Sequence, residues 1–457
     1  MLKNTFSKIS HYINNSSVSV LLFGIFVFVL PFWRRMEFTT PKSFLDGRFI
    51  EYLTYSIFSF DVILTILLTI WFFGALLGKK RMKNFNWKIM LSFFSIVFFS
   101  FISMLSANYR PISAYYIFSL LIMFVVIFFM FNSIKTKKDI FLVLNFFALS
   151  MFLQSLVAIF QFLKNQSIGL LFFGEQLISP ELNGIAKTSI NGVKHIRAYG
   201  TFSHPNILAL FLLTSLIVIF YLIVNYKDRV YRLFLFVASF FISLAIFFTF
   251  SRIVWLLTIG SIVFFSIKKN SFFTEIKKKL KDKRFIYILA FLIIIFLLFI
   301  FYFYPSIWWR INPFSATTWQ SFQDRFLVIK KSLILIREHP LFGIGIGNFV
   351  IEIAYLLTGY PVWMAEPVHN VFLLILTEIG IFGLTSFIFM LYYIYKEAKG
   401  APYFLKNISV VFLISMFFDH YFWDIRQAQY LLFIFIGFIL VFNSIKETHD
   451  QYKKNSA

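Results

Sequence analysis

Long apolar stretches alternate with short polar segments along the whole chain. A helix needs about 20 apolar residues to cross the hydrocarbon core of a bilayer, with a range of about 17–25. Stretches near that length recur so often that no separate soluble domain fits between them. The pattern predicts an all-α, polytopic integral membrane protein, a single membrane domain over residues 1–457 with about 12 transmembrane helices. The expected spans are 18–33, 57–77, 89–107, 112–131, 140–163, 207–224, 233–250, 253–267, 285–304, 371–394, 408–420 and 428–445.

One junction between these spans needs an argument beyond length. Residues 233–267 form a single apolar stretch that would be about 50 Å long as one helix, against a hydrocarbon core of about 30 Å. Basic clusters at 227–232 and 268–269 flank the stretch, and such clusters favour the cytoplasmic side of a membrane. The chain must therefore cross an even number of times between them, which predicts a turn near Ser251 and Arg252 on the outer face.

Composition and charge agree with this class. The chain is 60% hydrophobic and 14% charged, whereas soluble domains are about half apolar and about a quarter charged. A net charge of +23 would suggest nucleic acid in a soluble protein, but clusters between apolar runs fit the positive-inside rule instead. We expect no nucleic-acid partner, an uncleaved first span, and both termini on the cytoplasmic side of the cytoplasmic (inner) membrane. Cysteine is absent, which excludes disulfides and thiolate metal sites.

Two outer loops, 164–206 and 305–370, are long and are not of low complexity. Loops of more than about 12–15 residues are usually functional or disordered, and we expect function here. Residues 321–340 predict a helix in the outer interface, opening with Ser321 and Asp324 in capping-box-like spacing. Its apolar positions follow a 4-3-4-3 spacing on one face: Phe322, Phe326, Ile329, Leu333 and Ile336.

Three outer segments place specific polar groups beside apolar surface: residues 195–206, 250–255 and 367–370. The guanidinium groups of Arg197 and Arg252 suit phosphate oxygens, so we interpret both as candidates for binding a lipid diphosphate. Snorkelling toward lipid headgroups is the alternative, especially for Arg197. Arg252 lies in a turn too short to extend far into water, so its charge needs a partner.

His369 stands at the outer mouth of the span that begins at residue 371, where an imidazole could act as a general base near neutral pH. A structural histidine at a helix N-terminus is the alternative. His204 and His339 both precede proline, which predicts turn roles. The glycine-rich residues 343–347 predict a turn, because no strand precedes them as a dinucleotide-binding loop would require.

No metal or other cofactor is expected. The sequence shows no outer Asp-x-Asp and no cluster of histidine and carboxylate residues at metal-ligand spacing, since Asp61, Asp419 and Asp424 stand apart. If a diphosphate leaves at this face, arginines must stabilise its charge. Gln154 and Gln161 share one face of the span at 140–163, which favours hydrogen bonding between helices over a transport role.

The residues around His369 also carry a family pattern: His369, Asn370, nine residues, Gly380, two residues and Gly383. With RAYGTFSHPN, TFSR and EHPLFGIGIGNF, this pattern resembles the O-antigen ligase and O-antigen polymerase family of bacterial envelope proteins over roughly 190–395. The resemblance implies a helical fold related to the GT-C glycosyltransferases, with an external loop at 305–370 that carries interfacial helices.

The resemblance also implies an activity. Such proteins move a glycan from an undecaprenyl-diphosphate carrier to an acceptor hydroxyl on the outer face of the cytoplasmic membrane, without metal. His369 matches the proposed base, Arg197 and Arg252 match segments whose arginines hold the diphosphate, and Asn370 is the motif's second position and a candidate substrate contact. The implied partners are the lipid-linked donor, a lipid- or glycan-linked acceptor and the bilayer.

Other functions stay open. A polymerase of O-antigen, capsule or exopolysaccharide would share this motif. A polysaccharide or lipid transporter or flippase would place ionisable residues and broken helices at the bilayer midplane, whereas these spans are nearly free of charge. A structural scaffold of a polysaccharide assembly would need no ordered set of histidine and arginine residues.

Overall fold

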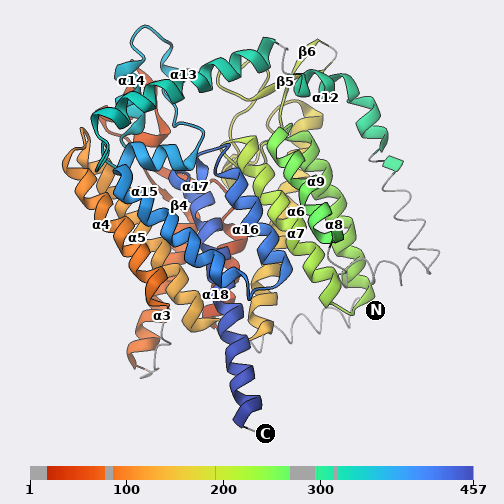
Figure 1. The fold of residues 1–457 in the computed structure, drawn as a ribbon. Helices are drawn as coiled ribbons and strands as arrows, with labels where there is room; N and C mark the ends of the chain where they lie inside the picture. The colour runs from red at the N-terminus through yellow and green to blue at the C-terminus, as the bar shows by residue number, and fades with distance from the viewer. Residues whose placement is uncertain are drawn as a thin grey trace. The chain divides into compact units, whose positions relative to one another are not determined.

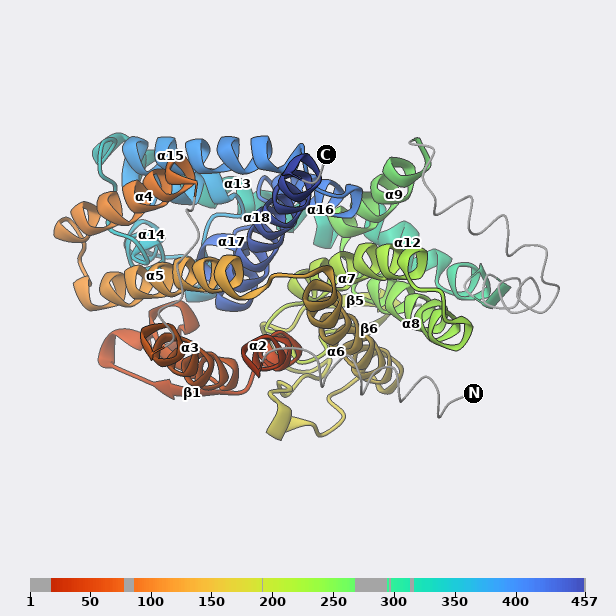
Figure 2. The same cartoon turned by 90° about the horizontal axis from the view of Figure 1, so that it is seen from below.

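The structure is a computed structural model that describes residues 18–77, 86–190, 192–267, 294–295, 297–312 and 316–455. The chain divides into two compact units (Figures 1 and 2). The first contains Met1–Arg34 and Lys138–Thr318, and the second contains Arg35–Lys137 and Trp319–Ala457. Both are mostly helical, as the apolar pattern predicts.

Within the described residues, eight helices are long and apolar enough to cross a membrane. They are α3 (Ser59–Leu77), α4 (Trp87–Leu105), α5 (Arg110–Ser133), α6 (Lys137–Lys164), α7 (Pro205–Asn225), α8 (Arg229–Phe248), α15 (Val371–Ala398) and α18 (Arg426–Asn455). Three shorter apolar helices are α2 (Val18–Val29), α9 (Arg252–Ile267) and α16 (Tyr403–Ser415). The class of polytopic membrane protein is thereby confirmed. Half of the expected span at 285–304 lies outside the described residues, so the total of about 12 spans stays a prediction.

The first unit packs around α7, which is buried along most of its length and contacts α8 and α9. The predicted turn between α8 and α9 is confirmed: α8 ends at Phe248, Phe250 takes a left-handed φ of 49°, and α9 begins at Arg252. The strands β5 (Lys187–Ile190) and β6 (Val193–Ile196) pair antiparallel and lead into α7. The short helix α12 (Tyr304–Ile311) packs against β5.

The second unit contains two closely packed helix pairs, α4 with α15 and α5 with α18. It also contains α3, α16, α14 (Phe349–Leu356), α17 (Tyr421–Asp424) and all but the first three residues of α13 (Ala316–Glu338). Residues 35–58 form two small antiparallel sheets, in which β1 (Arg35–Phe38) pairs with β4 (Tyr55–Phe58) and β2 (Phe44–Leu45) pairs with β3 (Arg48–Phe49). The all-α prediction therefore needs a correction. Short loop segments pair as strands here because extended backbone must find hydrogen-bond partners.

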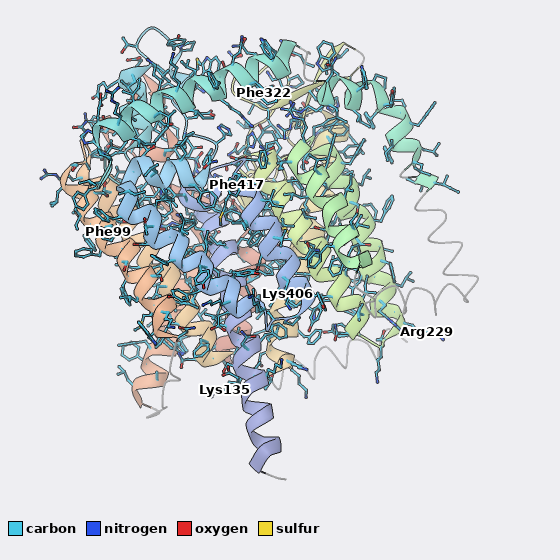
Figure 3. The ribbon with its side chains drawn as sticks, viewed as in Figure 1. Phe99, Lys135, Arg229, Phe322, Lys406 and Phe417 are labelled. Atoms are coloured by element: carbon cyan, nitrogen blue, oxygen red, sulfur yellow. The ribbon has the colours of Figure 1, made fainter. Side chains whose placement is uncertain are left out.

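The predicted helix in the second long loop exists as α13, but its predicted start was wrong. The helix begins at Ala316, and Ser321 lies inside its second turn. Asp324 accepts a hydrogen bond from Gln320 Nε2 at 3.1 Å, one turn earlier, instead of belonging to a capping box. The predicted apolar face is largely exposed, with Phe326 at 69%, while Ser332 and Leu335 on another face are buried. Figure 3 shows Phe322 on α13 and Lys135 at opposite ends of this unit.

Helix α15 is broken at Gly380, where φ is 68° and ψ is −171°. The residues 343–347 form the predicted turn, which packs into this break. The amides of Ile344 and Gly345 donate to the carbonyls of Thr377 and Glu378, each at 3.0 Å. The amide of Ile381 donates to the Pro340 carbonyl at 3.0 Å. The backbone carbonyls and amide at the break are therefore hydrogen-bonded to Pro340, Ile344 and Gly345.

Replacing Gly380 with alanine should destabilise the protein. A Cβ there would lie 2.1 Å from the Leu341 carbonyl oxygen, in a backbone region that L residues avoid. Such backbone strain alone costs about 1–3 kcal/mol. We expect a lower unfolding midpoint for Gly380→Ala in detergent. Gly74→Ala is the matched control, because Gly74 has open space around it in a helix. Equal midpoints for the two variants would contradict this assignment.

Candidate functional site

The segment before α15 is tied to the end of α16 by two hydrogen bonds. The Asn370 side chain caps α15, accepting from the Leu373 amide at 2.9 Å, and its Nδ2 donates to the Phe417 carbonyl at 3.2 Å. The Val371 amide donates to the Met416 carbonyl at 2.8 Å. Asn370 thus has a clear structural role, and its predicted contact with substrate is untested. These bonds hold His369 beside the residues that follow α16.

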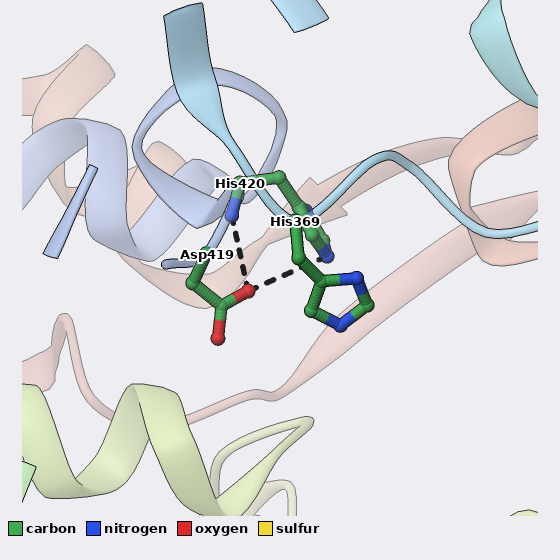
Figure 4. A group of neighbouring side chains, drawn as sticks. All are labelled: His369, Asp419 and His420. Carbon is green, nitrogen blue, oxygen red and sulfur yellow. Dashed lines mark hydrogen bonds and ion pairs between the residues drawn. The ribbon is translucent and has the colours of Figure 1, made fainter. Parts of the chain in front are cut away.

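Those residues supply the partners of His369 (Figure 4). Possible ligand atoms of His369, Asp419 and His420 all lie within 4.8 Å of one another. The two imidazole rings meet edge to face, with centroids 5.2 Å apart and planes at 88°. The expectation that Asp419 and Asp424 stand apart from the site was wrong. They are distant from His369 in sequence, and the fold brings them together.

The electrostatic surroundings keep His369 neutral near pH 7. Burial, together with the positive charges of Arg325 and His420, lowers the pKa of His369 to about 3, although the Asp419 carboxylate opposes this shift. An imidazole in this state has a free lone pair and can accept a proton. The sequence predicted a base at this position. The free lone pair is what a base needs, whereas the lowered pKa opposes protonation, so the Asp419 carboxylate must stabilise any imidazolium that forms.

His420 is in the opposite state. Burial opposes its charge, but the carboxylates of Asp424, Asp419 and Glu366 outweigh burial and raise the pKa of His420 to about 9. Its Nδ1 lies 2.8 and 2.9 Å from the two Asp424 carboxylate oxygens, and its Nε2 lies 3.7 Å from Asp419 Oδ1. His420 is thus a buried cation held between two acids.

The same three residues have the spacing of cation ligands. A protonated imidazole, however, has no lone pair to give to a metal, and both nitrogens of His420 face carboxylates. We therefore interpret the cluster as a buried ion-pair network. The expectation that no metal takes part stays a prediction.

Arg325 of α13 is a further site residue that sequence reasoning missed. It is half-buried, and its charge acts on both His369 and Glu366. Among the residues that the structure describes, no hydrogen bond or ion pair engages its guanidinium group. The sequence pattern of residues 321–340 gave Arg325 no role. By contrast, the run DHYFWD at 419–424 contained a usable signal, because an aspartate precedes His420 and another follows one helical turn later.

Arg197 lies in the first unit and is 5% exposed. Its Nε donates to the Thr249 carbonyl, and its Nη2 donates to Asn206 Oδ1 at 2.7 Å. The Ala198 amide also donates to the Phe248 carbonyl, at 3.0 Å. Arg197 therefore fastens the turn between α8 and α9, which is the structural alternative for this residue. A diphosphate contact by Arg197 is untested.

Arg252 is the first residue of α9 and is half-buried at the same turn. Arg310, from α12, also reaches this turn and donates from Nε to the Phe250 carbonyl at 3.2 Å. The guanidinium groups of Arg197 and Arg310 thus bind the turn at which Arg252 begins α9, and the sequence had indicated two of these three arginines. Because these arginines belong to the first unit and His369 to the second, their convergence on one substrate stays a prediction.

Several other polar residues have structural roles. Asp61 pairs with Arg426 at 3.2 Å and accepts from the Tyr430 hydroxyl at 3.0 Å, so it does not stand alone. His204 caps α7, accepting from the Asn206 amide at 3.1 Å, which confirms its turn role. Gln154 and Gln161 do form hydrogen bonds, but with the loop at 199–201 and with Glu175.

Fold and site together define a polytopic membrane protein with a buried histidine and acid cluster at the mouth of a broken span. Residues 237–388 match the family model described as O-antigen ligase, which confirms the resemblance seen in the sequence. This stretch includes Arg252, Arg325 and His369, while Arg197 lies outside it. The family carries out membrane glycan transfer of the O-antigen ligase or polymerase type. Comparison with curated proteins found no match.

The charge state of His420 predicts a pH dependence of stability. A histidine has an ordinary pKa of about 6.5 when unfolded. Because the folded pKa is raised to about 9, the stabilisation is complete below about pH 6.5 and is lost as the pH rises through about 9. The unfolding midpoint of the purified protein should fall across this window. His420→Gln should start from a lower midpoint and change less, and parallel curves for the two proteins would refute the charge assignment.

Proposed function

We propose that this protein is a membrane glycosyltransferase that moves a glycan from an undecaprenyl-diphosphate carrier to an acceptor hydroxyl on the outer face of the cytoplasmic membrane, as an O-antigen ligase does. The observation that carries the proposal is the neutral His369 imidazole beside the Asp419 carboxylate, inside the stretch that matches the O-antigen ligase family. A base and a nearby carboxylate are what activation of a hydroxyl requires.

In the proposed reaction, His369 accepts the proton of the acceptor hydroxyl. The acceptor oxygen forms a bond to the anomeric carbon while the bond between that carbon and the diphosphate oxygen breaks. Undecaprenyl diphosphate leaves with the electron pair of the broken bond. Asp419 stabilises the imidazolium as it forms, and the low pKa of His369 favours release of the proton to water afterwards.

Arginines take the role of stabilising the leaving diphosphate. Arg325 supports this role because its charge reaches His369 and no described residue pairs with it. Arg252 and Arg310 are proposed to bind phosphate oxygens at the turn between α8 and α9, since guanidinium groups match phosphate geometry. We assign Arg197 to ordering that turn, and Asn370 to positioning His369.

The finer architecture belongs to the same proposal: about 12 spans in a GT-C-like fold, a single membrane domain over residues 1–457, and a core at 190–395 with its external loop at 305–370. Both termini are assigned to the cytoplasmic side. Within the second unit, the position of Lys135 at the end opposite Phe322 supports this orientation, because lysines favour the cytoplasmic end.

A polymerase of O-antigen, capsule or exopolysaccharide is the nearest alternative, because it would use the same base on a glycan-linked acceptor. A transporter is less well supported. Three ionisable residues in the described spans of the second unit have structural partners: Asp61 pairs with Arg426, and Glu378 accepts from Trp423 Nε1 at 2.7 Å. Paired groups of this kind stabilise a bundle, which favours a structural role over a transport role for these three residues.

Replacing His369 with alanine should abolish transfer without affecting insertion or folding. Loss of a general base typically lowers the rate by about 10²–10⁴-fold. The assay follows labelled undecaprenyl-diphosphate glycan in membranes of a deletion strain that carries the variant, and measures loss of label from the lipid fraction. His339→Ala is the matched control, because His339 is exposed and outside the cluster. A fully active His369→Ala protein would remove His369 from the site.

Transfer should also proceed at its full rate in excess EDTA. The arginines supply the positive charge that a metal ion would supply elsewhere, and protonated His420 offers no ligand atom. The measurement compares initial rates in the same membranes with EDTA alone and with EDTA followed by excess Mg²⁺ or Zn²⁺. An absolute requirement for the added cation would contradict the arginine mechanism and support a metal at the cluster.

A further inference from the structure

His420 and Asp424 are outside the proton transfer that His369 performs, yet they are built into its surroundings. His420 is 7% exposed, and the Asp424 side chain is also 7% exposed. Placing two ionisable groups out of water is costly unless they are paired with good geometry. Nδ1 of His420 lies within 2.9 Å of both Asp424 oxygens, so this pairing is complete.

His420 also contacts Asp419 at two points. Its backbone amide donates to Asp419 Oδ1 at 3.0 Å, and its ring Nε2 lies 3.7 Å from the same oxygen (Figure 4). Asp419 is itself 5% exposed. One carboxylate oxygen is thus held from two directions by a single residue, which restricts the orientation of Asp419 beside His369.

The pair is anchored to the rest of the second unit through α17. Trp423, next to Asp424, donates from Nε1 to Glu378 Oε2 of α15 at 2.7 Å. Its carbonyl accepts a hydrogen bond from the Gln429 side chain of α18. On the other side, the Tyr52 ring packs edge to face on His420 with centroids 6.0 Å apart. Asp424 is therefore fixed relative to α15, the helix that begins after His369.

Charged and titratable groups from several elements face this pair. His369 and Glu366 come from the segment before α15, and Arg325 comes from α13. Arg48 of β3 acts on Glu366, and the buried hydroxyl-bearing rings of Tyr52 and Tyr116 lie close enough to sense the Asp424 charge. Among these groups, His420 is the cation that directly contacts both Asp419 and Asp424.

We infer that His420 and Asp424 form a positioning pair for the proposed transfer, in which Asp424 holds the His420 ring and His420 holds the Asp419 carboxylate facing His369. The inference rests on the proposed function. In this arrangement the side chains of Asp424, His420, Asp419 and His369 follow one another in a row. His420 and Asp424 neither touch the substrate nor accept its proton. The pair keeps one acid aligned and supplies a positive charge that disfavours premature protonation of His369.

The test compares His420→Gln and Asp424→Asn with the unaltered protein in full-length form, using the membrane assay for loss of labelled undecaprenyl-diphosphate glycan. Each variant should lower kcat by about 10²-fold, the effect expected when a reacting group is misplaced by about 1 Å, with little change in KM. Asp424→Glu keeps a carboxylate and should retain more of the rate than Asp424→Asn. His339→Gln is the matched control, because it alters an exposed histidine outside the cluster.

The pH profile of kcat/KM separates positioning from mere stability. In the unaltered protein, the acid limb should lie well below the ordinary histidine pKa, because burial and nearby positive charge hold the pKa of His369 down. Without the His420 charge, one of the two positive charges that lower the pKa of His369 is gone, so that pKa rises and the acid limb moves to higher pH. A purely structural role would lower the amount of folded protein and leave the limb in place.

The outcomes distinguish the two proposals. If the unaltered protein does not consume the donor, or if His369→Ala is fully active, the proposed function fails. If His369 is required but both His420→Gln and Asp424→Asn keep the original kcat and acid limb, the positioning pair is refuted while the function stands. A lower rate of His420→Gln with an unmoved acid limb also refutes it. If His420→Gln does not fold, Asp424→Asn decides, because it conserves side-chain shape: an unchanged kcat, or a rate that Asp424→Glu does not raise, refutes the positioning pair.

Discussion

Backbone hydrogen bonding inside a membrane is the constraint on which this structure depends. A lipid environment offers no water to an unpaired amide or carbonyl, so helices can break only where protein groups take over. The chain breaks its helices in the first unit at residues 249–251 and in the second unit at Gly380. At the first break Arg197 and Arg310 donate to carbonyls, and at the second the turn at 343–347 supplies amides.

The same constraint explains where the candidate chemistry lies. Residues that form hydrogen bonds with the unpaired backbone groups of a broken helix are polar, ordered and close to the apolar bundle. Arginines gather at the turn between α8 and α9 for this reason, and Asn370 caps α15 while holding the end of α16. A site for a prenyl-linked diphosphate needs ordered polar groups next to lipid, and helix breaks provide such groups without a soluble domain.

Charge in the second unit is balanced by pairing at close range. His369 and His420 share one environment, and their rings are in edge-to-face contact, yet their protonation differs. Asp424 makes the difference, because its carboxylate hydrogen-bonds to the ring of His420, and no such bond to His369 is present in the described part of the chain. Burial then penalises a second positive charge next to the first, so His369 stays neutral. Two residues of one type thereby acquire two chemical states from their neighbours.

The sequence by itself determined the class of protein, the positions of most helices, and the turn at Ser251 and Arg252. These follow from local quantities, namely apolar length and flanking charge, which a linear pattern records. The family pattern around His369 and Gly380 also lies within one short stretch of sequence. Motif spacing was therefore enough to indicate His369 as the candidate base.

Tertiary structure alone decided which residues surround His369. Asp419, His420 and Asp424 follow α16, Arg325 lies on α13, and nothing in the sequence pairs those segments with residue 369. It also showed that Arg197 is engaged with the α8–α9 turn and that α13 begins at Ala316. Side-chain contacts between distant segments, and the burial that shifts a histidine between neutral and charged, arise only when helices pack. A pattern of apolar and polar positions along one chain does not record that packing.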